Sequence, residues 1–420
     1  MKTWIWLICL TAVAVTAETP QEDPALELLN YFRDPEPHIT LKPKLTTADR
    51  IKGHGYPAET HQTITEDGYI ITMFRIPYSH KLQNQDKYRP IVLIQHGLFS
   101  SSDGWMLNGP NDGIGFNLAD AGYDVWFGNA RGNTYNRHHV SRSINHPYFW
   151  RFSWHEIGHY DIAAMIDYAL ARNGQGQESI HYIGHSQGTT VYFTLMSTRP
   201  EYNGKIKTAH MLAPVAYMSN MEDKLVKTLA PYLGHHNVYS ALFNDQEFLP
   251  HNELFTKLAY NACAPGSRVH GLCNSIGYML EGPETNSNTS VFPILAETHP
   301  AGCSTNQICH YMQEQQSGCF CLYDFGVAKN LDVYGHPLPP AYPVELITSL
   351  VHLWYSDNDD LAAVEDVERL AQKLPNKVMH HMEDPTWAHG DFSTHKEVKK
   401  YINDPIIDIM EAYEKDLLNV

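Results

Sequence analysis

The pentapeptide at residues 184–188 constrains the fold of this chain more than any other feature. It reads Gly-His-Ser-Gln-Gly, between a strand-like apolar run over residues 179–183 and a helix-compatible stretch over residues 189–196. A serine at such a strand-to-helix turn adopts a strained backbone conformation, and the flanking glycines avoid steric collisions. We therefore predict that Ser186 is a nucleophile raised clear of a sheet, beside a helix N-terminus that favours negative charge. The alternative is a tight structural turn with an incidental serine.

Short apolar runs alternate with helix-like stretches around this motif. In the first half of the chain the runs cover residues 91–95, 123–127, 179–183 and 211–215, and in the last part residues 349–355 and 377–382. Between the second and third runs, apolar residues recur at helical spacing at positions 162, 165, 166, 169 and 170. Strands that alternate with helices predict a mostly parallel sheet, whose C-terminal edge usually binds ligands.

The alternation stops between about residue 218 and residue 342. This stretch holds six of the seven cysteines and many Pro, Asn and Gly residues. We predict an α/β class chain with the α/β-hydrolase fold, in which a mostly parallel sheet flanked by helices carries an inserted segment built on a different plan. The predicted parts are a core over residues 18–217, the insertion over residues 218–340, and the rest of the core over residues 341–420.

A serine hydroxyl attacks an ester only when a base removes its proton, and a carboxylate usually orients that base. On this type of turn the acid and then the histidine follow the serine along the chain. The candidate acids, between which position does not choose, are Asp357, Asp359 and Asp360. The candidate bases are His380, His381, His389 and His395. His380 and His381 fall inside a strand-like run, whereas His389 lies in the following loop, so position favours His389.

The tetrahedral intermediate of acyl transfer needs hydrogen-bond donors for its oxyanion. One predicted donor is the backbone N–H of Gln187, the residue after the nucleophile. The second is the N–H of Leu98, in the loop that follows the run over residues 91–95. The alternative for this loop is an ordinary glycine turn.

The first seventeen residues have the features of an export signal. Lys2 precedes an apolar stretch over residues 4–15, and small residues surround a cleavage site after Ala17. The alternative is an uncleaved anchor, although no stop-transfer pattern follows, and no other apolar run reaches transmembrane length. We predict a secreted protein, extracellular or in a gut lumen, with delivery to lysosomes as the alternative because both routes use the same signal.

Charge and glycine spacing exclude several partners. Without Lys2 the chain has 29 basic and 47 acidic residues, a balance that repels nucleic acid and anionic membrane surfaces. Attachment to lipid would therefore depend mainly on apolar contact. The glycine-rich residues 128–132 lack the spacing of a dinucleotide-binding loop. No cofactor and no nucleic-acid partner are predicted.

Six cysteines remain outside the signal, and an exported chain usually oxidises such cysteines to disulfides. They are Cys263, Cys273, Cys303, Cys309, Cys319 and Cys321. Because Cys319 and Cys321 are too close for a comfortable pair, each is expected to bond to Cys303 or Cys309, in an undetermined order. A metal site that uses His310 fits no zinc spacing, so no metal is predicted. One glycosylation sequon begins at Asn288.

Several longer motifs give the chain a specific family resemblance. They cover residues 65–70, 95–98, 119–126, 128–134 and 184–190. With these motifs the chain resembles the animal acid lipases, the gastric and lysosomal acid lipase group, through nearly its whole mature length. The resemblance implies a neutral-lipid esterase with an α/β-hydrolase core, a cap domain and a movable lid.

The resemblance also implies roles for single residues. Ser186 matches the family nucleophile, and the oxyanion donors match Leu98 and Gln187. The family acid stands five residues beyond a tryptophan and before a Leu-Ala pair, which corresponds here to Asp359. The family histidine precedes Leu-Asp-Phe and corresponds to His389, although this chain has glycine in place of that leucine.

The cysteines match the family only in part. The family disulfide near the lid corresponds to Cys263–Cys273. Glu281 stands where vertebrate members have a cysteine, and the other four cysteines have no counterpart in the family pattern, which suggests a divergent, invertebrate branch.

The expected activity is hydrolysis of neutral lipid esters at a lipid–water interface, and the sequence does not separate triacylglycerol from steryl or retinyl esters as the substrate. Two alternatives stay open at this point: a carboxylesterase for small soluble esters, and a non-catalytic lipid carrier on a lipase scaffold.

Overall fold

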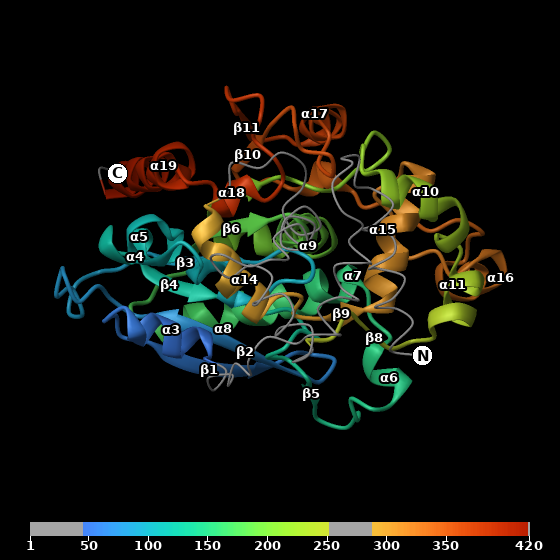
Figure 1. Cartoon of the computed structure of the whole chain (residues 1–420), viewed down its shortest axis with the longest axis horizontal. Coiled ribbons are helices and arrows are strands. Elements are labelled where there is room, and N and C mark those ends of the chain that lie inside the picture. Colours follow the sequence, from blue (N-terminus) through green and yellow to red (C-terminus); the bar gives the residue numbers. More distant parts are fainter. Residues whose placement is uncertain (1–44, 252–287, 419–420) are drawn as a thin grey trace, which may run out of the picture.

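The computed structural model describes residues 45–251 and 288–418. The predicted export signal over residues 1–17 and the predicted pair Cys263–Cys273 lie outside these residues, as does most of the proposed lid. Within the described ranges a nine-stranded sheet runs through the middle of the molecule (Figure 1). Its strands are β1 (Glu59–Ile64), β2 (Tyr69–Ile76), β3 (Ile91–Gln95), β4 (Asp124–Phe127), β5 (His138–His139), β6 (Ile180–His185), β7 (Ile206–Leu212), β10 (Val351–Tyr355) and β11 (Lys377–His381).

The order of the strands places the elbow motif in the middle of the sheet. The order is β1-β2-β4-β3-β6-β7-β10-β11, with β5 beside β2. All neighbours from β4 to β11 pair in parallel, whereas β1 and β2 form an antiparallel hairpin that also joins β4 antiparallel. The C-terminal ends of β3, β6, β10 and β11 therefore meet at one edge, as the sequence predicts for a mostly parallel sheet.

Helices flank the sheet and cover both of its faces. Those of the core are α3 (Thr47–Gly53), α4 (Gly109–Asp112), α5 (Ile114–Asp120), α6 (Pro147–Trp150), α7 (Trp154–Glu156), α8 (Ala163–Asn173), α9 (Gln187–Thr198), α17 (Val364–Lys373), α18 (Asp391–Thr394) and α19 (Asp404–Leu418). Among the described residues, no helix combines the length and the apolar character that a membrane crossing requires.

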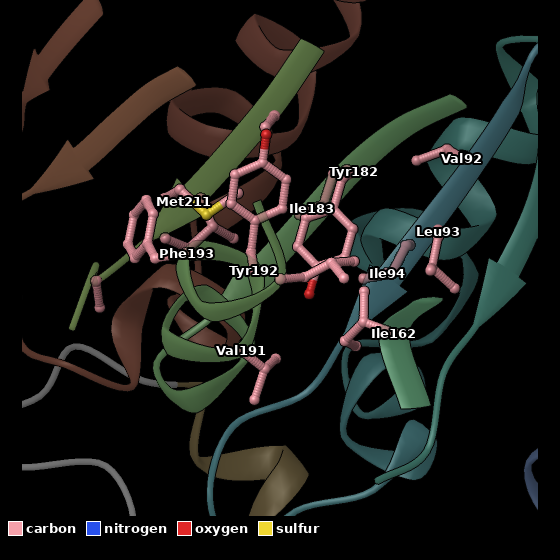
Figure 2. Packing of buried hydrophobic residues seen from close by; sticks show 14 of the residues in the cluster. Val92, Leu93, Ile94, Ile162, Tyr182, Ile183, Val191, Tyr192, Phe193 and Met211 are labelled. Atoms are coloured by element: carbon pink, nitrogen blue, oxygen red, sulfur yellow. The ribbon is translucent and has the colours of Figure 1, made fainter. Parts of the chain in front are cut away.

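The central strands are buried on both faces, which explains their continuous apolar runs. All four residues from Ile91 to Ile94 in β3 are fully buried. Figure 2 shows the apolar side chains of α9 beside those of the neighbouring strands. The rings of Tyr182 in β6 and Tyr192 in α9 lie 4.9 Å apart. This core holds α9, and with it the turn at Ser186, firmly against the sheet.

Strand β7 differs from the prediction. It begins five residues before the predicted run over residues 211–215 and ends at Leu212, because Ala213 has a positive φ of 50°. The first half of β7 contains polar side chains, so the sequence shows no continuous apolar run there. Thr208 Oγ1 lies 2.8 Å from His181 Nδ1, and both residues are buried. Buried polar residues that bond to one another break the apolar pattern without breaking the strand.

The chain between β7 and β10 follows a different plan. Its described helices are α10 (Lys224–Leu233), α11 (His236–Phe243), α14 (Phe292–Thr298), α15 (Thr305–Ser317) and α16 (Val327–Tyr334). The short strands β8 (Glu247–Phe248) and β9 (Cys303–Ser304) pair with each other and not with the main sheet. Helices α10, α11, α15 and α16 gather on one side of the molecule (Figure 1). A small cluster of apolar residues, which includes Ala230, Tyr239 and Met312, is separate from the main core.

The predicted pairing of four cysteines is wrong. Cys319 and Cys321 bond to each other with their Cα atoms 5.3 Å apart, and Cys303 and Cys309 are buried thiols. The thirteen residues of α15 separate Cys303 from Cys319. At 1.5 Å per residue that helix spans about 20 Å, far beyond the reach of a disulfide. The short separation of Cys319 and Cys321 in the sequence predicts no disulfide between them, but the turn after α15 brings their sulfur atoms together.

Candidate active site

Ser186 lies between the end of β6 and the start of α9. Its backbone has φ 52° and ψ −119°, a conformation that non-glycine residues rarely adopt. The Ser186 N–H donates to the Leu212 carbonyl at 3.0 Å, and the Ser186 carbonyl accepts from the Thr189 N–H at 2.8 Å. These bonds hold the strained turn between the neighbouring strand and the first turn of the helix.

The two glycines of the motif are required by backbone contacts. A Cβ atom on Gly184 would lie 2.6 Å from the Gly188 carbonyl oxygen. A Cβ atom on Gly188 would lie 2.4 Å from the Gln95 carbonyl oxygen, at the end of β3. Both distances are shorter than any normal contact, and the atoms that would be struck belong to the backbone, which has no room to move. The motif therefore packs the helix tightly onto the ends of two strands.

The loop after β3 lies beside the serine. A Cβ atom on Gly97 would lie 3.1 Å from Ser186 Cβ, so the loop and the elbow are in direct contact. Leu98 is half-buried and packs against the main core, and Phe99 has a positive φ of 61°. In the described residues, the Leu98 N–H makes no hydrogen bond to the protein. The structure thus brings both predicted oxyanion donors, Leu98 and Gln187, next to Ser186.

The His96 side chain holds that loop in place through two hydrogen bonds. Its Nε2 accepts a hydrogen bond from the Ala130 N–H at 3.1 Å, so its proton is on Nδ1, which donates to the Gly97 carbonyl at 2.8 Å. Burial lowers the pKa of His96 to about 4, although the bond to Gly97 opposes the shift. His96 is therefore a neutral structural support, a role that the sequence analysis did not assign to it.

His389 and Asp359 form a close buried pair. His389 Nδ1 lies 2.8 Å and 2.9 Å from the two carboxylate oxygens of Asp359. The backbone N–H groups of Leu361 and Ala362 donate to the same carboxylate at 3.0 Å and 2.8 Å. Burial would raise the pKa of Asp359, but the charge and hydrogen bond of His389 and these two N–H groups lower it below its usual value. The carboxylate therefore stays ionised and holds the imidazole in one orientation.

The other candidate acids have different partners. Asp357 is exposed and bonds to His381 Nε2 at 2.8 Å. Asp360 is partly buried, and burial followed by the nearby charge of Asp359 raises its pKa to about 6. Of the three aspartates between which position could not choose, the structure brings Asp359 to His389.

The other candidate bases also pack elsewhere. His380 stacks on Trp354 with ring centroids 3.9 Å apart and bonds to His352. His395 stacks on Trp387 at 4.1 Å. These contacts are typical of histidines that pack in a core, and they leave His389 as the histidine beside the elbow.

His185, the residue before Ser186, joins the elbow to the His389 loop. Its Nε2 donates to the His389 carbonyl at 2.9 Å, and the two rings lie 5.1 Å apart. This contact shows that the elbow and the His389–Asp359 pair occupy one site, although they lie about 200 residues apart in the sequence. The sequence analysis assigned His185 no role. Its place inside the motif, directly before Ser186, is the signal that could have identified it.

Helix α15 reaches the elbow from the segment between β7 and β10. Gln307 Nε2 donates to the side-chain oxygen of Gln187 at 2.9 Å, and Tyr311 donates to Thr190 Oγ1 at 3.1 Å. The same Gln307 caps its own helix through the Ser304 N–H. The inserted segment is therefore bonded to the first turn of α9, next to the predicted oxyanion donor.

A pocket of about 440 Å³ also touches Asp359. Its lining includes Asn220, Glu222, Asp357 and Glu365, which are polar or acidic. Such a surface suits water better than an acyl chain, so we do not assign the lipid tail to it.

The comparisons with known proteins agree with this geometry. A family model described as alpha/beta hydrolase fold matches residues 90–395, and one described as partial alpha/beta-hydrolase lipase region matches residues 47–109. The chain is 42% identical to Lipase 3 of Drosophila melanogaster over 375 residues, covering 89% of this chain and 94% of that protein. It is 37% identical to human gastric triacylglycerol lipase over 417 residues, covering 98% and 100%.

A solved structure supports the fold. The soluble variant of monoglyceride lipase from Saccharomyces cerevisiae, in complex with a substrate analog, matches with a TM-score of 0.51 at 12% identity. The match covers 89% of this chain and 97% of that structure. At this identity the likeness shows the α/β-hydrolase fold alone, while the sequence relatives show the family. The chain belongs to the gastric and acid lipase family and is a lipase, a serine ester hydrolase whose substrates are lipid esters.

Proposed function

We propose that this lipase hydrolyses neutral lipid esters, above all triacylglycerol, through Ser186, His389 and Asp359. The observation that carries the proposal is the buried His389–Asp359 pair, joined by His185 to the strained turn that carries Ser186. Burial of the pair excludes water and strengthens its electrostatic interactions. The name of the human relative, a gastric triacylglycerol lipase, supports this substrate class.

The proposed chemistry has two acyl-transfer steps. His389 takes the proton of the Ser186 hydroxyl, and the serine oxygen attacks the ester carbonyl. The N–H groups of Leu98 and Gln187 stabilise the oxyanion, and His389 then protonates the leaving alcohol. Water repeats the attack on the acyl-enzyme, which releases the fatty acid and restores the serine. Asp359 stays ionised throughout and stabilises the protonated His389.

The decisive experiment compares Ser186→Ala with Ser141→Ala on emulsified triacylglycerol and on a short soluble ester. Ser141 is an exposed serine after β5 and serves as the matched control. We expect Ser186→Ala to lose at least about 10³-fold in kcat on both substrates while unfolding at an unchanged temperature. Ser141→Ala should keep full activity. Substantial turnover by folded Ser186→Ala would refute the mechanism, whereas wild-type protein that turns over neither ester would favour the non-catalytic lipid carrier.

The same assay tests the substrate class. We expect turnover per enzyme to rise when the substrate passes from a dissolved short ester to an emulsified long one. Equal or lower turnover on the emulsion would favour a carboxylesterase for small soluble esters. A chain-length series, with steryl esters as a second series, sets the limits of the acyl site.

The inserted segment over residues 218–340 is proposed to act as a cap over Ser186, with a lid near residues 250–282. The bonds from Gln307 and Tyr311 to α9 support a cap in contact with the elbow. Lid opening at a lipid surface would expose the site. If activity follows substrate concentration smoothly through the point at which the ester forms an emulsion, no interfacial opening is required.

Export and glycosylation are also proposed. The described Asn288 is partly exposed just before α14, and its side chain accepts a hydrogen bond from Ser290, the third residue of the sequon. Secretion, with delivery to lysosomes as the alternative, follows from the signal over residues 1–17. Expression in animal cells should yield a processed chain in the medium, and Asn288→Gln should reduce its apparent mass by one glycan.

A further inference from the structure

The His185 side chain belongs to the elbow and contacts two other segments of the site, the loop that carries His389 and the loop that carries Leu98. His185 is the last residue of β6 and directly precedes Ser186. Its Nε2 lies 2.9 Å from the His389 carbonyl oxygen. On its other side, a Cβ atom on Gly97 would lie 3.3 Å from its Nδ1. His185 therefore contacts the base loop and the oxyanion loop from within the elbow itself.

The contact determines which nitrogen carries the proton. A carbonyl oxygen only accepts, so Nε2 of His185 is the protonated nitrogen and Nδ1 is not. Burial, followed by the charge of neighbouring His389, lowers the pKa of His185 to about 4. The bond to His389 and the Asp359 carboxylate oppose this shift, and His96 adds to it. Above about pH 5 the ring is therefore a neutral donor, which matters because a second cation would repel protonated His389.

The need for this bond follows from the order of the strands. Asp359 orients the His389 ring, but it belongs to the loop after β10, and β7 lies between β10 and β6. On the far side, the Ala388 N–H donates to Asp391 at 2.8 Å, which ties the base loop to α18. Neither contact fixes the distance between the base loop and the elbow, whereas the His185 bond joins them directly.

We propose that His185 is a positioning residue that fixes the main chain of His389 against the elbow, and so fixes the distance between the catalytic imidazole and Ser186. The inference rests on the proposed triad and goes beyond it, because His185 itself transfers no proton. A displacement of the base by about 1 Å lowers turnover by up to about 10²-fold. The bond should therefore affect kcat far more than KM.

The test uses two amides of different length. In His185→Gln the amide nitrogen reaches the position of Nε2 and can still donate to the His389 carbonyl. In His185→Asn the amide reaches only the position of Nδ1 and falls short. On a soluble ester we expect His185→Asn to lose about 10- to 100-fold in kcat at little change in KM, and His185→Gln to recover most of it. Equal activity of the two folded variants would overturn the proposal.

A second measurement is made on the wild-type protein, and one folded variant is needed only to assign its signals. Imidazole nitrogen resonances of 15N-histidine-labelled enzyme distinguish the two neutral tautomers, and His185→Gln, or Ser186→Ala if that variant does not fold, assigns the His185 signals through their loss or shift. We expect His185 to carry its proton on Nε2 from pH 5 to pH 8 without titrating. The other tautomer, or titration near pH 6.5, would overturn the inference.

Failure of the proposed mechanism gives a different result. If folded Ser186→Ala keeps its ester turnover, the triad assignment fails whatever His185 does. If Ser186→Ala is inactive and the Asn and Gln variants of His185 match wild type, the triad stands and the positioning role alone is lost.

Discussion

Two parts of this lipase meet beside Ser186, and they are built in different ways. At the edge of the sheet, the backbone contributes much of the arrangement: a positive φ at Ser186, a glycine against Gln95, and two N–H groups that donate to the Asp359 carboxylate. In the segment between β7 and β10, side chains make the contacts, and α15 buries Glu314, whose carboxyl oxygens have no hydrogen-bond partner among the described residues.

The buried carboxyl groups of Asp359 and Glu314 show how the two parts differ. Burial acts in the same direction on Asp359 and Glu314, towards a higher pKa. Three donors reverse the effect at Asp359, whereas the part of the chain that the structure describes offers Glu314 no donor, and its pKa lies well above its usual value. The sheet edge therefore keeps a buried carboxylate ionised, while the inserted segment carries a carboxyl group that is costly to ionise. Loss of the Asp359 carboxylate should therefore lower catalysis, whereas loss of the Glu314 carboxyl should change stability.

The largest expected effect comes from Asp359→Asn. An amide would hold His389 in the wrong tautomer, so kcat should fall about 10⁴-fold with the fold intact. The measurement is kcat on a soluble ester together with the unfolding temperature. Asp357→Asn is the control, because Asp357 is exposed and bonds to His381. A similar loss in both variants would contradict the assignment of Asp359.

Gly188→Ala tests whether the backbone really determines the elbow. The added methyl would meet the Gln95 carbonyl at 2.4 Å, so the free energy of unfolding should fall by about 3 kcal/mol, and activity should fall with it. Gly204→Ala is the matched control, since a Cβ atom there meets nothing within 4 Å. Chemical denaturation measures both. A Gly188→Ala protein as stable as the control would show that the close packing at the elbow is not required.

Glu314→Gln tests the insertion. Because the folded-state pKa of Glu314 is raised, the wild-type residue loses stability as pH rises above its ordinary pKa of 4.5. Relative to wild type, the glutamine variant should gain nothing at pH 4 and up to about 2 kcal/mol at pH 6. The measurement is the free energy of unfolding across this range, with exposed Glu365→Gln as the control. A pH-independent difference would mean that Glu314 finds a partner in the intact protein.

Cys319→Ser should have the smallest effect. The disulfide closes a loop of very few residues, so its loss should lower the free energy of unfolding by about 1.5 kcal/mol or less. Alkylation of the unreduced, denatured protein should modify Cys303 and Cys309 and leave Cys319 and Cys321 unmodified. A peptide map that links Cys303 or Cys309 to either of the other two would restore the pairing that the sequence suggested.

Most of the predictions made from the sequence depend only on residues that are close together along the chain. Strand β3 has the predicted bounds, because a strand buried on both faces is apolar throughout. The helix after the elbow and the choice of Ser186 followed from glycine spacing, which reports a short-range steric constraint. The predicted bounds of β7 were wrong because its buried polar residues bond to partners on β6. The sequence does not show which residues become neighbours in the sheet.

The sequence alone determined the class of fold. It also predicted Ser186 as the nucleophile with a short set of acids and bases, because each of these depends on neighbours within a few residues, and the family resemblance then pointed to Asp359. Only the tertiary structure decided that Asp359 rather than Asp357 or Asp360 reaches His389, that Cys319 bonds to Cys321, and that His185 donates to the His389 carbonyl. These contacts depend on the order of strands in the sheet and on the length of α15. Such distances arise when distant segments pack together, and no local pattern records them.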